Sequence, residues 1–380
     1  DVGDVLTLSS LTGYGAIRTD GAGTSGATVI RNIVVNQSGT TTFNGAIVSH
    51  MSTGSNGRAI QFEKQGGGSL TLAGFIGQQT VSGTPAGGFI QVPVNLVANG
   101  GLLDITNASN STTTNATAIN NSGTVTITSG TLGFASQALV NTAGSAGVAS
   151  IRMNGGVLRW ETGNTQDLTA GASSRLTLVD TKTATFNTNG NNVTLANALG
   201  GGAIAAAVTK VGAGLLSLNG TNAFTGDMTI TTGTLQIGGA GRLGGGAYGG
   251  SIVNDAVFVF ASSTDQTLSG PISGSGAFTK SGAGTLTLTA SNSYAGATSL
   301  QGGVLRIGGG GTTGSLPAGA IPVSAGATLA FARSDDYGGT FSNLISGSGG
   351  IRLESGLLTL GVANTYVGTT LVQSGTLQLG

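Results

Sequence analysis

Three stretches of the chain repeat one pattern at a spacing of about seventy residues. They are GAGLLSLNGTNAFTGDMTITTGTLQIG at 212–238, GAGTLTLTASNSYAGATSLQGGVLRIG at 282–308 and SGLLTLGVANTYVGTTLVQSGTLQLG at 355–380. The matching glycines lie 70 residues apart from Gly214 to Gly284 and 72 apart from Gly284 to Gly356. A pattern that recurs together with its intervening sequence is typical of similar units stacked into a solenoid.

The composition indicates which kind of solenoid this is. Of the 380 residues 71 are glycine, and interior glycine disfavours a helical repeat. With only 5 prolines and no strict every-third glycine, collagen is excluded. The 38% of hydrophobic residues alternate with threonine, as in Leu286-Thr287-Leu288-Thr289, which indicates short strands with one buried face and argues against disorder. Gly, Asn and Ser-Gly close these strands, as expected of β-helix corners.

Each repeat shares two further features. Seventy residues correspond to roughly three coils of ~20–30 residues. We expect inward-facing leucine pairs at Leu216 and Leu218, Leu286 and Leu288, and Leu358 and Leu360. An Asn-x-aromatic-x-Gly step follows each pair, at Asn222, Phe224 and Gly226, at Asn292, Tyr294 and Gly296, and at Asn364, Tyr366 and Gly368. We interpret the step as a turn that Asn enters and Gly leaves, with the ring over one end of the core.

The solenoid is predicted to run through the whole chain in three parts. Residues 1–75 carry a degenerate copy, because Phe62–Leu72 matches the segment around Lys210. Residues 76–192 keep the strand-and-turn style but lose the repeated phrase, with longer turns predicted from Asn107 to Asn121. Residues 193–380 form the regular part.

The phrases VTKVGAGLLSLNGTNAFTGDMTITTGTLQIG and TKSGAGTLTLTASNSYAGATSLQGGVLRIG resemble the autotransporter-associated β-strand repeat of Gram-negative type V secreted passengers. The match covers roughly residues 193–380, with fainter similarity near 32–75. The resemblance implies an all-β, right-handed parallel β-helix of the pertactin-like kind, displayed outside the outer membrane and frequent in adhesins. It implies no single activity, because such passengers carry varied functions on one scaffold.

Other parts expected of such a protein are not recognised in this sequence. The start, DVGDVLTLSS, lacks the charged and apolar regions of a signal peptide. No amphipathic strands with aromatic girdles follow the repeats, so any membrane contact would be through a barrel outside this sequence. The last coil is expected to be uncapped, which favours either further coils or self-association through solenoid ends.

Few residues offer catalytic or metal chemistry. The chain has no cysteine, and its one histidine, His50, is interpreted as a plain loop residue. Asp335 and Asp336 are the only adjacent carboxylates; we expect a solvated turn, with a Ca²⁺ or glycan contact as the alternative. The glycine runs at 244–250 and 308–311 lack the GK[ST] of a phosphate loop and are read as corners or inserts. No catalytic residue, metal site or cofactor is predicted.

Three lysines, Lys64, Lys210 and Lys280, occupy one repeat position. About three coils are expected between the last two, some 14 Å at ~4.8 Å per coil, and we interpret these lysines as guards of exposed turns. The net charge is zero, so nucleic acid and anionic membrane are not expected partners. Trp160 is interpreted as a core or end plug, with sugar stacking as the alternative.

These observations favour a non-catalytic extracellular passenger or stalk on a Gram-negative cell surface, contacting host or neighbouring-cell molecules or glycans. The alternative is a structural protein that stacks into filaments or sheaths, because few charges and zero net charge give little repulsion. An enzyme on a β-helix is the least favoured class, because only scattered carboxylates support it.

Overall fold

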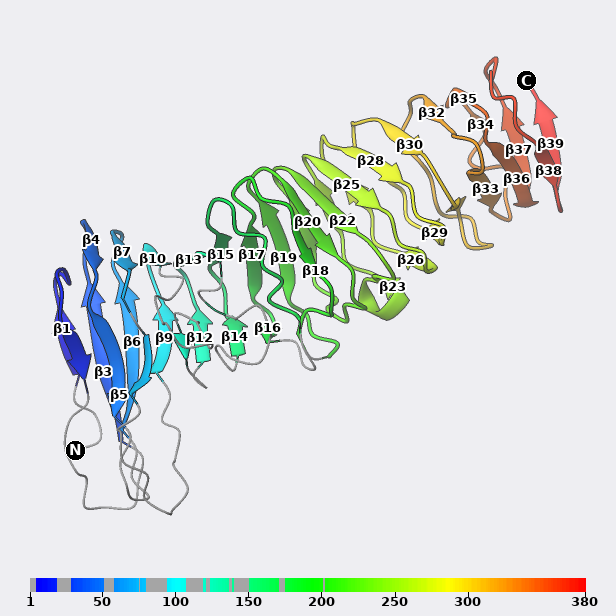
Figure 1. The fold of residues 1–380 in the computed structure, drawn as a ribbon. Helices are drawn as coiled ribbons and strands as arrows, with labels where there is room; N and C mark the ends of the chain where they lie inside the picture. The colour runs from blue at the N-terminus through cyan, green and yellow to red at the C-terminus, as the bar shows by residue number, and fades with distance from the viewer. Residues whose placement is uncertain are drawn as a thin grey trace. The chain divides into compact units, whose positions relative to one another are not determined.

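The computed structural model describes residues 5–18, 29–50, 58–74, 76–79, 94–106, 119–120, 124–136, 139, 150–170, 175–200 and 202–380. The chain divides into two compact units, residues 1–191 and 192–380. Within each unit, short parallel strands from successive coils stack in register (Figure 1). The predicted parallel β-helix is therefore confirmed.

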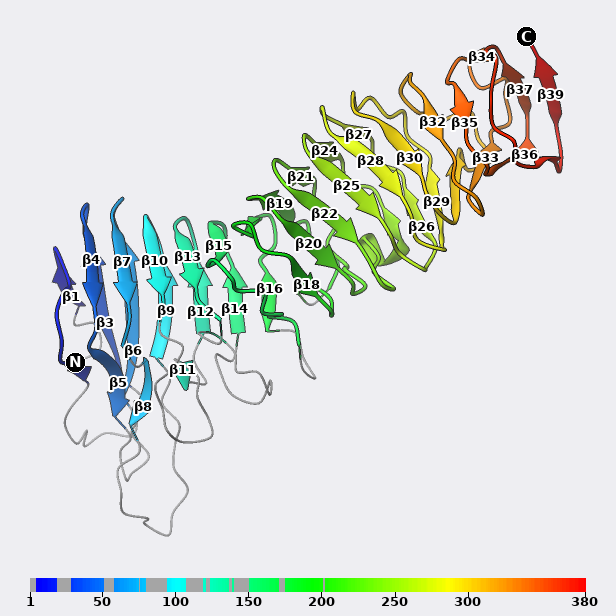
Figure 2. The ribbon, with the colours of Figure 1, turned by 45° about the horizontal axis from the view of Figure 1, so that its top comes forward.

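The first unit has three sets of stacked strands, and in Figures 1 and 2 the labelled strands of the first two sets follow one another in chain order. One set contains β1 (Val5–Leu8), β3 (Val29–Asn36), β6 (Arg58–Gln65), β9 (Val94–Ala98), β12 (Thr124–Ile127), β14 (Ser150–Met153) and β16 (Leu176–Leu178). The second contains β4 (Thr40–Phe43), β7 (Ser69–Leu72), β10 (Leu102–Ile105), β13 (Thr131–Phe134), β15 (Val157–Trp160) and β17 (Thr183–Asn187). The third contains β2 (Ala16–Arg18), β5 (Ala46–His50), β8 (Ile76–Gln79) and β11 (Ile119–Asn120).

The second unit also has three faces, which we name after one strand of each. The β19 face contains β19 (Ala207–Val211), β21 (Met228–Ile230), β24 (Ile252–Asn254) and β27 (Ile272–Ser273). The β20 face contains β18 (Val193–Leu195), β20 (Leu215–Leu218), β22 (Thr234–Ile237), β25 (Val257–Phe260), β28 (Ala277–Lys280) and β30 (Thr298–Leu300). The β29 face contains β23 (Ala247–Tyr248), β26 (Gln266–Leu268), β29 (Thr285–Leu288), β31 (Val304–Ile307), β33 (Thr328–Ala332), β36 (Gly350–Ser355) and β38 (Thr370–Val372).

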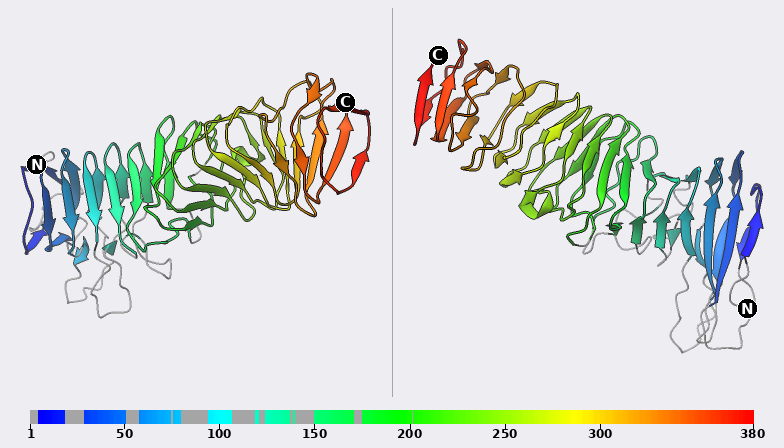
Figure 3. Two further views of the ribbon diagram at one scale, coloured as in Figure 1. Left: turned by 90° about the horizontal axis from the view of Figure 1, so that it is seen from above. Right: turned by 180° about the vertical axis from the view of Figure 1, so that it is seen from behind.

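The last coils complete the second unit with two smaller sheets. One pairs β32 (Ile321–Pro322) with β35 (Ile345–Ser346), and it adjoins β30 through the bridge between Leu300 and Val323. The other orders β34 (Thr340–Phe341), β37 (Leu357–Leu360) and β39 (Thr376–Leu379). One short 3₁₀ turn, η1 (Gly244–Gly246), lies in the first predicted glycine run, directly before β23. Figure 3 shows the coils of this unit from two further sides.

The core of each unit is a column of inward-facing aliphatic and aromatic side chains. Along most strands buried and more accessible residues alternate, as in Ser69-Leu70-Thr71-Leu72 and Thr234-Leu235-Gln236-Ile237. In-register pairing then places like residues above one another, for example Leu235 on Phe258. A narrow core of this kind is filled by one or two side chains per strand, which explains why 5% of aromatic residues suffices.

The seventy-residue repeat does not contain a whole number of coils. Leu216, Leu235, Phe258 and Phe278 are stacked in register on the β20 face, so three coils end at Phe278. Leu286, the repeat equivalent of Leu216, comes only after the next corner, in a strand of the β29 face. One repeat therefore spans three coils plus the strand of one additional face, whereas three coils were predicted.

The same shift recurs in the next repeat. Leu286, Leu305, Leu329 and Ile351 are stacked on the β29 face. Leu358 follows shortly afterwards in β37, which belongs to a different sheet. Successive copies of the phrase therefore lie on successive faces of the β-helix.

Two predictions about the first half of the chain have different outcomes. The longer turns predicted from Asn107 to Asn121 lie outside the described residues, except for β11. The subdivision into 1–75, 76–192 and 193–380 stays a prediction.

We expect Leu286→Ala to destabilise its coil by about 2–5 kcal/mol, because this fully buried side chain packs in a stacked column that cannot collapse. Thr285→Ala on the outward side of the same strand should change stability by less than about 0.5 kcal/mol. Hydrogen exchange of the full chain, followed by mass spectrometry of peptides spanning 278–307, measures the difference. Equal protection in the two variants would contradict the assigned inward face.

Candidate functional site

The repeated asparagine joins three consecutive coils. Asn292 Oδ1 accepts a hydrogen bond from Ile272 N at 2.8 Å in the preceding coil. Its Nδ2 donates to Ala290 O at 3.1 Å in its own coil and to Ser315 O at 2.7 Å in the following coil. The side-chain amide therefore satisfies backbone groups that a corner removes from the strand ladder.

Asn222 makes all three of these contacts, and Asn364 makes the first two. Asn222 Oδ1 accepts from Leu199 N at 2.8 Å, and Nδ2 donates to Gly220 O at 2.8 Å and to Arg242 O at 3.3 Å. Asn364 Oδ1 accepts from Ile345 N at 2.7 Å, and Nδ2 donates to Val362 O at 3.0 Å. These asparagines link neighbouring coils as well as entering a turn.

The aromatic residue of the step lies in the core in the first two copies. Phe224 and Tyr294 are buried, and Phe224 meets Tyr248 edge-on with ring centroids 6.0 Å apart. Tyr294 keeps its hydroxyl satisfied against Thr298 Oγ1 at 2.6 Å, and Tyr366 does the same with Thr370 at 2.5 Å. The hydroxyl of each tyrosine thus has a partner in the strand that follows the turn.

The glycine of the step is required by close approach of two coils. A Cβ on Gly226 would meet the backbone of Ala206, one on Gly296 that of Gly276, and one on Gly368 that of Gly349, each at well under 3 Å. None of the three has a positive φ. Their role is therefore steric room between stacked coils.

The inward leucine pairs fill the core in all three copies. Leu216, Leu218, Leu286, Leu288 and Leu358 are 0–1% exposed, and Leu360 is 4% exposed. Their strands β20, β29 and β37 bring each pair onto a different face, so the three pairs do not converge on one site.

The prediction that the repeated lysines guard exposed turns is wrong. Lys64, Lys210 and Lys280 are fully buried. The Lys210 Nζ donates to Val211 O at 3.0 Å, to Gly212 O at 2.6 Å and, in the next coil, to Thr232 O at 3.2 Å. Glycines at the corner let backbone carbonyls point inward, and the ammonium donates hydrogen bonds to these carbonyls.

The other two lysines repeat this arrangement. Lys280 Nζ donates to Gly282 O and, at 3.1 Å, to Gly302 O in the following coil. Lys64 donates to Gln65 O and, at 3.0 Å, to Gly66 O, so the degenerate first copy keeps the same corner. Lys210 lies in β19 and Lys280 in β28, on different faces, so the two lysines are not aligned above one another at the spacing predicted for a shared face.

Burial changes the acid–base behaviour of these corners. Desolvation lowers the pKa of Lys210 and of Lys280 to about 8, with Asp265 opposing the shift at Lys280. Desolvation also lowers the pKa of Lys64. Lys210 and Lys280 therefore titrate within an accessible pH range.

Gln266 plays a corner role that sequence reasoning missed. Its Oε1 accepts from Leu243 N at 2.8 Å, and its Nε2 donates to Leu243 O at 3.1 Å and Thr267 O at 2.8 Å. No repeated motif marks it, but a glutamine at an inward position of the alternating strand Gln266–Leu268 is a usable signal.

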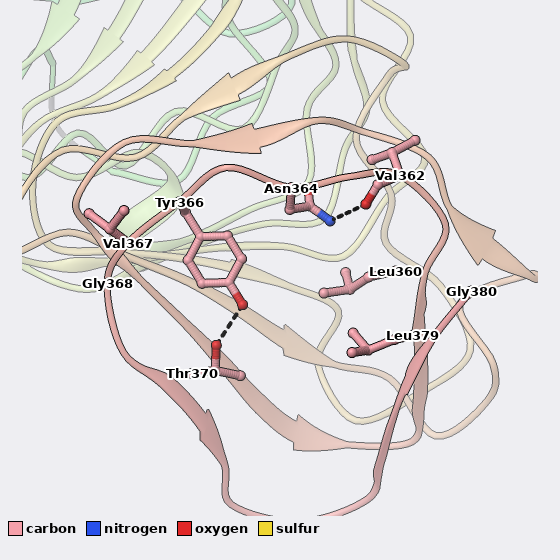
Figure 4. A pocket seen from close by; sticks show the side chains of 9 residues that line it. All are labelled: Leu360, Val362, Asn364, Tyr366, Val367, Gly368, Thr370, Leu379 and Gly380. Atoms are coloured by element: carbon pink, nitrogen blue, oxygen red, sulfur yellow. Dashed lines mark hydrogen bonds between the residues drawn. The ribbon is translucent and has the colours of Figure 1, made fainter.

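A pocket of about 460 Å³ lies at the third copy, shown from close by in Figure 4. Leu360 and Leu379 face it together, and Tyr366 lies opposite them with its hydroxyl on Thr370 (Figure 4). Val367 is 82% exposed here. Asn364, Tyr366, Thr370 and Leu379 line the pocket at repeat positions that are buried in the two preceding copies.

The candidate residue Trp160 of the first unit has a structural role. Trp160 is fully buried between Phe134 and Phe186, with ring centroids 5.3 and 6.3 Å away, and Nε1 donates to Gln166 O at 2.9 Å. The interpretation as a core residue is confirmed, and the sugar-stacking alternative is wrong.

His50 and the Asp335–Asp336 pair do not form a catalytic group. His50 ends strand β5 and is register-paired with Gln79 and Arg58, so the loop assignment is wrong. Asp335 forms an ion pair with Arg333 at 2.5 Å, and Asp336 Oδ1 accepts from Gly338 N at 3.1 Å in a turn. The expected turn is confirmed.

A carboxyl pair on the outside of the first unit was not predicted. Asp104 and Arg159 flank Gly133 in register, and a Cβ on Gly133 would lie 2.7 Å from Asp104 Oδ1 and 2.5 Å from Glu161 Oε1. Arg159 pairs with Glu161, at 2.5 Å, whereas the buried Asp104 Oδ1 has no hydrogen-bond partner among the described residues. Desolvation and the charge of Glu161 raise the pKa of Asp104 to about 6.

The described residues contain no group of three or more His, Cys, Asp or Glu side chains placed to hold a metal ion. Nor do they contain a helix long and apolar enough to cross a membrane.

Comparison with known proteins agrees with the repeat analysis. The passenger-associated-transport-repeat family matches at residues 208–237, 278–307 and 353–379. The chain is 33% identical over 193 residues to the adhesin BmaC autotransporter of Brucella suis biovar 1 (strain 1330), covering 42% of this chain and 5% of that protein. No solved structure matches the chain. The predicted resemblance to repeat-bearing autotransporter passengers is confirmed.

We expect Lys280→Met to destabilise the second unit by about 1–3 kcal/mol at pH 7, because methionine fills the space but leaves the Gly282 and Gly302 carbonyls unpaired. Lys182→Met, which removes an exposed lysine, should stay within about 0.5 kcal/mol of the parent. Urea unfolding of the full chain, followed by circular dichroism, measures both. Equal midpoints would show that the corner ammonium contributes nothing.

Stability of the second unit should depend on alkaline pH. Between pH 8 and 10.5 the unfolded chain binds more protons than the folded chain at Lys210 and Lys280, so stability rises with pH in this window. Burial raises the pKa of Tyr337 to about 12, so ionisation of the unfolded tyrosine opposes this rise above about pH 10 and lowers stability beyond about pH 10.5. Thermal unfolding across pH 7–11 tests this; a Lys210→Met/Lys280→Met variant should lose the rise.

Asp104→Asn should stabilise the first unit at neutral pH. Because the raised pKa of Asp104 means that the folded state binds the extra proton, wild-type stability falls as pH rises from about 4 through 6. After allowance for solvent screening, the amide should gain about 1 kcal/mol at pH 7.5 and nothing at pH 4. Hydrogen exchange of peptides spanning 94–106 at the two pH values measures the change in stability. An equal gain in stability at both pH values would contradict the raised pKa of Asp104.

Proposed function

We propose that the chain is a segment of an extracellular passenger, a non-catalytic stalk and adhesive surface on a Gram-negative cell. The observation that carries the proposal is that the residues shared by the three matched repeats are used for stacking. Their asparagines, aromatics, glycines and leucines lie in corners and core, or repeat such a position at the pocket of the third copy. What varies between repeats is the outward surface, which suits a scaffold that presents different contacts along its length.

Adhesion is the activity that the comparison favours. The matching relative is named an adhesin, and the matching repeat is named for passenger transport. The chain spans about 5% of the length of that relative, so adhesion by this segment is a proposal of its own. We infer that the partners are molecules or glycans on host or neighbouring cells.

A non-enzymatic role is supported by how the carboxylates are used. Asp335 and Glu354 are ion-paired with arginines, and Asp265 accepts a backbone hydrogen bond from Thr285 at 2.7 Å. Catalytic carboxylates of polysaccharide-cleaving enzymes need two groups facing one substrate bond. The carboxyl pair at Asp104 and Glu161 instead crowds the space above Gly133.

Beads coated with the purified chain test the adhesive role. We expect them to adhere to cultured epithelial cells at several times the level of beads coated with the heat-unfolded chain. Adherence equal to that control would contradict the proposal. Sizing of the chain over a hundredfold range of concentration is the companion measurement, and concentration-dependent filaments would favour the structural alternative.

A further inference from the structure

A polar groove lies on the outward side of the β29 face. The parallel register places Thr267, Thr287, Arg306, Ala330 and Arg352 in one row across β26, β29, β31, β33 and β36. The groove has a volume of about 400 Å³, at the small end for ligand sites.

Glu354 holds the two arginines of the row in place. Its Oε2 accepts from Arg306 Nε at 2.6 Å, and its Oε1 contacts Arg352 through both Nε at 2.8 Å and Nη2 at 2.6 Å. Ala330 lies between the two arginines in the row and is fully buried. Because the carboxylate holds Arg306 through Nε and Arg352 through Nε and Nη2, the positions of both guanidinium groups are fixed before any ligand arrives.

The charges of this cluster do not cancel. Two arginines share one glutamate, and the groups are partly accessible, at 29% for each arginine and 17% for Glu354. Burial disfavours the charged form of Glu354, but hydrogen bonds from Arg306 and Arg352 hold its pKa below the ordinary value. One positive charge therefore remains at this end of the groove.

The other end of the groove offers hydrogen bonds without a positive charge. Asp265, Thr267 and Thr285 line it; Asp265 is exposed, and the two threonines are partly accessible. A carboxylate accepts hydrogen bonds from ligand hydroxyls, and a threonine hydroxyl both accepts and donates them. An arginine fork, in contrast, matches a carboxylate.

We propose that this groove binds an acidic saccharide, with the sugar carboxylate on Arg306 and Arg352 and the sugar hydroxyls on Asp265 and the threonines. The inference rests on the proposed adhesive function and gives it a ligand class and a place on the molecule. A neutral sugar would leave the positive charge of the two arginines without a partner. A ligand with negative charge along its whole length would be repelled by Asp265 at the other end of the groove.

Isothermal titration of the full chain with three probes tests the site. The probes are 3′-sialyllactose, tri-galacturonic acid and lactose. We expect at least one acidic probe to bind at least tenfold more tightly than lactose, and its affinity to fall as salt rises. The two acidic probes distinguish a sialic acid source from a uronic acid source.

Variants locate the binding. Arg306→Gln/Arg352→Gln should lower the affinity for the acidic probe at least tenfold, whereas Arg152→Gln, at an exposed arginine of β14, should leave it unchanged. Arg306→Lys keeps the charge but loses the fork, and should lie between them. Unchanged hydrogen-exchange protection of 278–307 shows that the variants fold.

Two outcomes overturn the inference: the double variant binds the acidic probe like the parent, or lactose binds as tightly as both acidic probes. Beads that still adhere to cells while neither acidic probe binds would refute the groove and leave adhesion standing. Specific binding of an acidic probe by a chain whose beads do not adhere would support the groove and refute the adhesive role.

Discussion

The corners of the coils set the main constraint on this fold. Strands of a parallel β-helix satisfy their own backbone groups, but each corner turns carbonyl and amide groups toward the next coil at a spacing of about 4.8 Å. The chain meets this with buried polar side chains, namely an ammonium at Lys210 and Lys280 and amides at Asn222, Asn292 and Gln266. Unpaired corner groups would each cost about 1–3 kcal/mol, so these few residues decide whether coils can stack.

Repeat length and coil length together determine what the surface looks like. Each repeat is longer than three coils by one corner and one face. The equivalent leucines Leu216, Leu286 and Leu358 therefore lie on successive faces. The same shift moves the outward residues that differ between copies. A single sequence phrase thus supplies all three sides of the β-helix with core positions, while the outer faces are free to carry different groups, such as the arginine row of the β29 face.

Much of this fold could be predicted from the sequence, for identifiable reasons. Alternation at Leu286 and Leu288 and the repeated Asn-x-aromatic-x-Gly step reflect local geometry, so strands, inward faces and corners follow. The lysines were misread because a charged residue is normally expected outside, and only stacking shows three carbonyls converging on one amine. The face shift depends on the exact length of each coil, which turn insertions alter without a sequence signal.

The groove on the β29 face and the Asp104–Glu161 pair could not be predicted from the sequence, because both also depend on how the coils stack. Arg306 and Glu354 are far apart in the sequence and meet only because two coils bring β31 and β36 onto one face. Asp104 and Glu161 meet only because Gly133 stands between their strands. In-register stacking over variable coil lengths creates such groups, so they appear only once the coils are placed.

Pulsed electron spin resonance on the cysteine-free chain tests the central claim, that copies of the repeat lie on successive faces of one stack. Labels at Thr229→Cys and Ser293→Cys lie on the same side three coils apart, so their backbones should be separated by about 14 Å. Labels at the repeat equivalents Thr229→Cys and Ser299→Cys lie on different faces and should give a clearly longer distance. Equal short distances for the two pairs would mean that the repeats stack directly on one another and would contradict the account.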